Sequence, residues 1–164
     1  MQLTKLERLI LVNQFTILEK LDPQAAKASK EACEILRDGY TLEYDTLVSG
    51  FDTEVSEDKC TEVRDILDMY RALQNALREL PAGSVPAKDT TFQGFDGNEE
   101  GEHHAYAQFL IEVQGKWAES KNAPLNSHRP MIQRYRAMLR EWKQSADKWH
   151  LTVEDVGRVV SQKG

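Results

Sequence analysis

The apolar positions of the first segment follow helical spacing but cover most of the helix circumference. Residues 4–21 contain the apolar side chains Leu6, Leu9, Ile10, Leu11, Val12, Phe15, Ile17, Leu18 and Leu21. At about 100° per residue they extend far beyond one stripe, and a helix that is apolar nearly all round is buried on several sides. We therefore expect this helix to be either the centre of the fold or half of a subunit interface.

Five further segments predict helices, at 22–38, 56–80, 98–117, 131–143 and 151–160, with a weaker signal at 40–51. The segment 56–80 is the clearest, because its apolar residues recur every three or four positions. Capping-box spacing marks two helix starts, Thr4 with Glu7 and Thr152 with Asp155. Ser56 is a typical N-cap, and Gly39 fits a left-handed helix end.

The pattern predicts an all-α fold, a compact bundle of about six or seven helices in a single domain spanning residues 1–164. Residues 81–98 form the longest predicted loop, and its Phe92 and Phe95 are expected to pack back onto the body. In the helix that follows, we expect an inward face made by five residues: Tyr106, Phe109, Leu110, Val113 and Trp117.

Composition is that of a globular protein, with 40% hydrophobic and 29% charged residues in 164. The longest uninterrupted apolar run, Leu9 to Val12, is far too short for a membrane span, and the N-terminus lacks a signal-peptide core. Cys33 and Cys60 have no metal-type spacing, so we expect two reduced thiols and a cytoplasmic protein that does not contact membranes.

Charge is distributed unevenly along the chain. Residues 31–68 carry a net charge of −9 and residues 121–150 a net charge of +5, within a total of −6. The two segments either face each other or form separate solvated surfaces, and solvated surfaces are the commoner case. The overall negative charge argues against nucleic acid as a partner, so a nucleic-acid accessory role for the basic stretch around Arg134–Lys143 is the last alternative.

Two amides interrupt the apolar first helix. Asn13 lies one turn from Leu9 and Ile17, and Gln14 has similar apolar neighbours, so both are expected in apolar surroundings. A buried amide needs hydrogen-bond partners. Most such amides serve the fold, and the functional alternatives are an amide that lines a small pocket or one that fixes the register of a subunit contact.

Candidate ligand-binding residues follow from these amides, from tyrosines able to line an apolar pocket, and from the long loop. They are Asn13, Gln14, Tyr40, Tyr70, Phe95 and Asp96. We expect this site, if it forms, where the first helix meets the loop residues 92–96. No catalytic residue, metal ligand or cofactor is assigned.

One alternative is a metal-dependent enzyme. Glu99 and His103, and Glu100 and His104, are spaced four apart, so each pair shares a helix face. Asp96 would supply a further ligand beside Glu100, His103 and His104. Zinc sites usually need three or four protein ligands. The competing interpretation is an acidic first helical turn followed by exposed histidines, which is ordinary at helix starts.

Several motifs, in order along the chain, resemble the YfbU family. They are Arg8–Gln14 followed by Asp22-Pro23, Gly39-Tyr40, Met69–Leu73, Phe92–Asp96, Tyr135–Leu139, Trp142 and His150-Leu151. The resemblance covers essentially the whole chain and implies a bacterial, cytosolic, all-helical protein. Some members carry an added helix-turn-helix segment, which implies ligand binding by this domain. No such segment is expected here, and the family implies no catalytic residues.

We therefore expect a non-enzymatic domain for ligand binding or protein–protein interaction. It should be a homo-oligomer formed through the first helix or through the helix at 56–80, with a small ligand as a further expectation. An oligomer would explain the all-round apolar first helix, and the chain lacks any recognisable catalytic motif.

Overall fold

The computed structural model describes residues 1–84 and 87–163 and confirms the all-α prediction. The structure is 62% helical and has no strand among the described residues. Contacts divide the chain into two compact helical units, Met1–Glu54 and Val55–Gly164. We describe each unit by itself, and the predicted single domain stays a prediction.

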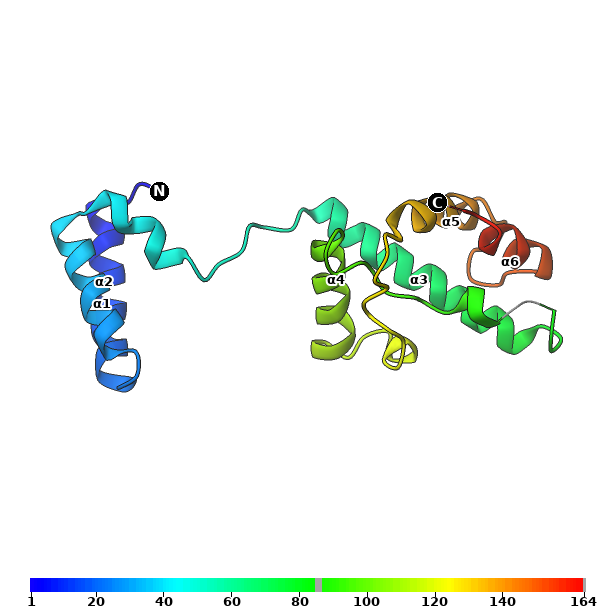
Figure 1. Cartoon of the computed structure of the whole chain (residues 1–164), viewed down its shortest axis with the longest axis horizontal. Helices are drawn as coiled ribbons and strands as arrows, with labels where there is room; N and C mark the ends of the chain where they lie inside the picture. Colours follow the sequence, from blue (N-terminus) through cyan, green and yellow to red (C-terminus); the bar gives the residue numbers. More distant parts are fainter. Residues whose placement is uncertain (85–86, 164) are drawn as a thin grey trace. The chain divides into compact units, whose positions relative to one another are not determined.

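The N-terminal unit consists of α1 (Lys5–Leu21), α2 (Ala26–Asp38) and the 3₁₀ helix η1 (Thr41–Val48). Helices α1 and α2 lie side by side (Figure 1). The predicted capping box is present at the start of α1, where the Thr4 side chain accepts from the Glu7 amide and the Glu7 carboxylate accepts from the Thr4 amide. Gly39 ends α2 in the left-handed region, at φ 76°.

Helix α2 begins later than predicted. Residues 23–25 form a turn, because the Asp22 carboxylate accepts the Gln24 amide at 2.9 Å and so caps that turn instead of the helix. The weak signal at 40–51 corresponds to η1.

The core of the N-terminal unit is small, and α1 contributes little to it. The buried residues are Val12, Cys33, Ile35, Leu36 and Tyr44. Val12 is the one buried residue of α1. The expectation that α1 is the buried centre of the fold is therefore wrong within its own unit, since its apolar residues outnumber the positions that α2 and η1 cover.

The C-terminal unit is built on the long helix α3 (Glu57–Glu79) (Figure 1). Around it lie α4 (Gly101–Gln108), the π-helical turn η3 (Phe109–Val113), α5 (Ile132–Lys143) and α6 (Val153–Val160). Short 3₁₀ turns occupy Ala87–Thr90 (η2) and Ala118–Ser120 (η4). The Ser56 cap of α3 and the Thr152–Asp155 capping box of α6 are confirmed.

The long loop packs into the core of this unit, as predicted. Phe92 and Phe95 are fully buried, and their rings contact Tyr70 and Tyr135 at centroid distances of 5.5–5.9 Å. The backbone of Phe95 also forms an isolated parallel bridge with Asn126, which joins the loop to the segment before α5. The predicted loop includes residues 85–86, which lie outside the described residues.

The predicted inward face after residue 98 is only partly confirmed. Leu110 and Trp117 are buried and Tyr106 packs against the core, whereas Phe109 and Val113 are exposed. His103 and Ala107 are buried instead. One of the two interpretations of His103 was an exposed histidine, but its ring lies 5.5 Å from that of Phe95. Burial of His103 rotates the helix so that Val113 points to solvent.

The acidic and basic segments meet within the C-terminal unit. Arg136 of α5 binds the Glu62 carboxylate of α3 through two hydrogen bonds, at 2.7 and 3.0 Å, and Lys143 of α5 pairs with Asp65 of α3. These ion pairs between the acidic and the basic segment thus join α3 to α5. Among the helices of residues 1–84 and 87–163, none has the length and hydropathy that a membrane span requires.

Candidate functional site

Helix α1 places polar side chains toward its own unit. The Arg8 guanidinium donates to the carbonyl oxygens of Leu36 and Arg37 at 2.6 and 2.7 Å, where α2 ends and its last carbonyls lack helical partners. About two turns further, the Thr16 hydroxyl donates to the Val12 carbonyl at 2.7 Å and lies 3.6 Å from the Cys33 sulfur. These contacts fix which side of α1 faces α2.

The opposite side of α1 is apolar and exposed. Its side chains are between 45% and 75% exposed, and they are Leu6, Leu9, Ile10, Ile17, Leu18 and Leu21. We call this set, with Asn13 and Gln14 between its members, the outer stripe of α1. Together the six side chains expose roughly 600 Å² of apolar surface, which is at the upper end of the largest patch on a typical monomer. Patches of this size mark binding surfaces.

Asn13 and Gln14 lie in the middle of the outer stripe and are exposed. The expectation that the fold buries these amides is wrong within the N-terminal unit. Both residues point away from α2 because Arg8, Val12 and Thr16 occupy the inner side of the helix. Their neighbours one turn away, such as Ile10 and Ile17, are exposed with them.

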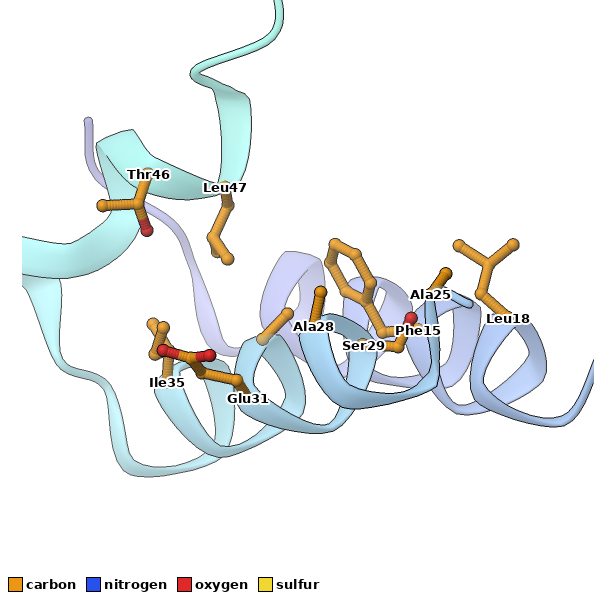
Figure 2. A pocket seen from close by; sticks show the side chains of 10 residues that line it. Phe15, Leu18, Ala25, Ala28, Ser29, Glu31, Ile35, Thr46 and Leu47 are labelled. Atoms are coloured by element: carbon orange, nitrogen blue, oxygen red, sulfur yellow. The ribbon is translucent and has the colours of Figure 1, made fainter. Parts of the chain in front are cut away.

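A groove of about 390 Å³ lies beside the outer stripe (Figure 2). Its floor is the alanine-rich side of α2, including Ala28, with Ala25 just before the helix, and Leu47 of η1 stands over it. Phe15 and Leu18 from α1 also line it, and its polar members are Ser29, Glu31 and Thr46. The small side chains of α2 leave this space open, and its volume is within the range of small-molecule sites.

A second apolar groove, of about 340 Å³, shares Phe15 and Leu47 with the first. The rest of its lining comes from the start of the chain, from Leu11, from Val48 at the end of η1, and from the exposed Phe51 beyond it. The N-terminal unit therefore presents apolar surface on more than one side of α1.

The predicted ligand-binding residues are divided between the two units. Asn13, Gln14 and the half-exposed Tyr40 belong to the N-terminal unit, and Tyr70, Phe95 and Asp96 belong to the C-terminal unit. Neither unit by itself contains all six. A hydrogen bond to the carboxylate of Asp38 raises the pKa of Tyr40.

Tyr70, Phe95 and Asp96 have structural roles where they lie. Tyr70 and Phe95 are buried in the aromatic cluster described above, and burial raises the pKa of the Tyr70 hydroxyl well above its usual value. The Asp96 carboxylate accepts the amides of Asn98 and Glu99 at 2.8 and 3.3 Å, which organises the turn before α4.

Glu100 also serves the fold. One carboxylate oxygen accepts the amides of Met131 and Ile132, each at 2.7 Å, and the other accepts the amide of Asp96 at 3.0 Å. This buried carboxylate therefore caps the start of α5 from a distant part of the chain. The sequence offered Glu100 only as a metal ligand of the alternative enzyme, because a long-range cap leaves no local pattern.

The remaining members of the predicted metal set do not join Glu100. His103 binds Glu62 through its Nε2 atom at 3.0 Å, and hydrogen bonds from Arg136 and then His103 hold the pKa of Glu62 below its usual value. His104 is half-buried on a neighbouring position. Within residues 1–84 and 87–163, no group of three or more His, Cys, Asp or Glu side chains is arranged to hold a metal ion.

Several basic side chains of α5 are used inside the unit. Besides the Arg136 and Lys143 pairs, Arg134 lies 3.6 Å from the Asp89 carboxylate and donates to the carbonyl of Val160 at 3.4 Å. These pairs weaken the case for a phosphate-binding surface.

The sequence predicted a subunit interface on the first helix as one of two alternatives, whereas the grooves were missed, although their signals are present in the sequence. The stripe follows from the excess of apolar residues in α1, and the groove from the alanines of α2. A family model for the YfbU domain matches residues 1–162, which span both units. The chain therefore belongs to the YfbU family.

Proposed function

We propose that this protein is a non-enzymatic association domain that works as an oligomer, with the outer stripe of α1 as the contact surface. The observation that supports it most is the orientation of α1. Arg8 and Thr16 face the helix's own unit while isoleucines and leucines face away. A soluble helix normally has the reverse arrangement, so the outer stripe needs a partner.

The size of the surface is compatible with this role. Two patches of roughly 600 Å² give about 1,200 Å² of buried surface, which is the lower limit of standard protein interfaces. The other interface expected from the sequence, the helix at 56–80, is less suitable. Its apolar residues, including Ile66 and Leu73, are buried in the core of the C-terminal unit.

The proposal includes a cytoplasmic location. Cys33 and Cys60 are both free thiols, which suits a reducing compartment. Cys33 is buried against the Val12 carbonyl, so oxidation of this thiol would disturb the small core of the N-terminal unit.

Sedimentation of the full chain tests the association. We compare the wild type with the double variant Ile10→Lys/Ile17→Lys at concentrations up to about 100 μM, well above the Kd of weak interfaces of this size. We expect the wild type to sediment as a complex larger than the 18.8 kDa chain and the variant to sediment as a single chain. Lysine is a good helix former, so the helical circular dichroism should not change.

The matched control is Leu42→Lys/Phe51→Lys, which replaces two exposed apolar residues of the same unit outside α1. This control should assemble like the wild type. A wild type that remains a single chain at every concentration would refute the proposal. Equal assembly of the Ile10→Lys/Ile17→Lys variant would refute the assignment to α1.

Ligand binding is a second candidate, supported by the groove in Figure 2. The groove is mostly apolar, so a neutral apolar molecule is the class that fits it. Titration with the neutral dye Nile red tests this, with Ala28→Leu as the variant that fills the floor. We expect the wild type to bind the dye and the variant to lose binding by tenfold or more. Equal binding by both chains would contradict a ligand site in the groove.

A further inference from the structure

The outer stripe of α1 has the same order of residue types from either end. Positions at equal distances from the point between Asn13 and Gln14 match each other in kind. The matched pairs are Leu6 with Leu21, Leu9 with Leu18, Ile10 with Ile17, and Asn13 with Gln14. The point of symmetry lies next to Asn13, the central residue of the helix Lys5–Leu21.

The regular geometry of an α-helix places these matched residues symmetrically about the midpoint of α1. With 100° and 1.5 Å per residue, Ile10 and Ile17 lie within about 10° of the centre line of the stripe. Leu6 and Leu21 lie about 11 Å from its midpoint in opposite directions. A second α1 running the opposite way, related by a two-fold axis at the midpoint, therefore brings leucine to the level of leucine and isoleucine to the level of isoleucine.

One pair of charged residues beside the stripe favours the antiparallel direction. In the antiparallel arrangement, Glu7 lies at the level of Lys20 of the second copy. In a parallel arrangement each of these two residues would lie at the level of its own copy, so like charges would share a level. Like charges at an interface disfavour a partner, and opposite charges favour it. Both side chains are exposed.

The two amides account for the register. Near the two-fold axis, Asn13 and Gln14 meet the same amides of the second copy, and each amide group can both donate and accept. Sliding one helix by a turn would place these amides against isoleucine or leucine, where their hydrogen bonds would be lost. A polar residue in an apolar helix seam specifies register in this way.

We propose that α1 pairs with α1 of a second copy of this chain in an antiparallel arrangement, about a two-fold axis that passes between Asn13 and Gln14. The inference rests on the proposed association role of the outer stripe and adds the partner's identity, direction and register. The contact is the same patch on both chains, as a closed two-fold dimer requires.

Single cysteines with a short bismaleimide cross-linker test the arrangement. The full chain carries Cys60→Ser in all samples, and buried Cys33 is kept. Gln14→Cys should cross-link to itself, because the two copies of position 14 lie close to the axis on helices about 8–10 Å apart. Asn13→Cys is the second variant at the axis and should do the same.

Leu6→Cys gives the contrasting result. Two copies of position 6 are about 22 Å apart along the antiparallel pair, so this variant alone should not cross-link. A mixture of Leu6→Cys and Leu21→Cys chains should cross-link, because positions 6 and 21 share a level. The chain with Cys60→Ser alone is the control.

The outcomes separate this inference from the proposed function. Self-cross-linking of Leu6→Cys, or none at positions 13 and 14 in a chain that sediments as an oligomer, would overturn the antiparallel pairing and leave the association role intact. A chain that is monomeric by sedimentation and never cross-links would overturn both.

The role of the amides has its own test. Asn13→Leu/Gln14→Leu removes the polar pair and should keep or increase association while it relaxes the register. The two copies of position 10 are about 10 Å apart along the proposed pair and come level when one helix slides by about two turns, so Ile10→Cys should cross-link to itself faster in that background than with both amides present. An equal rate in the two backgrounds would overturn the assignment of register to Asn13 and Gln14.

Discussion

The hydroxyl of Tyr135 should be one of the most important single polar groups in the C-terminal unit. Tyr135 is fully buried on α5, and its hydroxyl donates to the Gly94 carbonyl at 2.8 Å and accepts from the Gln93 amide at 3.3 Å. Tyr135→Phe keeps the ring in the aromatic cluster and removes both hydrogen bonds. The substitution therefore isolates the attachment of the loop to α5.

The expected cost follows from the two backbone groups. The Gly94 carbonyl is buried and would lose its 2.8 Å partner, which costs about 1–3 kcal/mol. Gln93 is half-buried and its bond is longer, so its amide should add less than about 1 kcal/mol. We expect Tyr135→Phe to lower the free energy of unfolding by about 2–3 kcal/mol in total.

Urea titration followed by tryptophan fluorescence is a suitable assay, because Trp117, Trp142 and Trp149 all lie in the C-terminal unit. At an ordinary urea dependence the midpoint should fall by roughly 1 M or more. Tyr70→Phe is the matched control. Its hydroxyl lies 3.7 Å from the Met138 sulfur, a weak acceptor, so its loss leaves no backbone group unpaired and should cost less than about 1 kcal/mol. Equal effects of the two substitutions, or none for Tyr135→Phe, would refute this reasoning.

Three further predictions concern the same unit. Gly94→Ala should cost at least about 2 kcal/mol in the same titration, since Gly94 has φ 81° and an added Cβ would lie 2.3 Å from the Leu125 carbonyl oxygen; an unchanged midpoint would contradict the contact. The Arg136 hydrogen bonds hold the pKa of Glu62 below 4.5, so their stabilising effect is present above pH 4.5 and is lost as the pH falls through that lowered pKa. Melting temperatures against pH should therefore fall less steeply on the acid side for Arg136→Gln, and identical profiles would refute the assignment. Burial raises the pKa of Tyr70 above 10, so the neutral hydroxyl stabilises the folded state fully below pH 10, and this stabilisation is lost as the pH rises further. In an alkaline titration, the tyrosinate absorbance of the last tyrosine to ionise should therefore appear together with the loss of helicity, not before it.

Local patterns predicted the helices well, because helix starts and ends depend on residues within one turn. Both capping boxes, the Ser56 cap and the left-handed Gly39 lie where the sequence indicates them. The late start of α2 shows the limit of such patterns, since an aspartate followed by proline can cap either a helix or a turn.

Orientation was harder to predict than helix position. Which side of α1 faces inward is decided by Arg8 and the carbonyl oxygens of Leu36 and Arg37, 28 and 29 residues away. His103 faces inward because it meets Phe95 in the preceding loop and Glu62 of α3, which is 41 residues away. The candidate site depended on these orientations, and Asn13 and Gln14 are exposed within the N-terminal unit for that reason.

The hydrogen bonds from Arg8 to the end of α2 have a consequence for newly made chains. They hold α1 with its leucines and isoleucines toward water as soon as the N-terminal unit folds, and this unit leaves the ribosome before the C-terminal unit does. Exposed apolar surface of this kind is recognised by chaperones and proteases. Because association would cover this surface, the lifetime of a chain in the cell should rise with the concentration of chains already present. At a low rate of synthesis, the amount of protein should therefore fall more than in proportion to that rate.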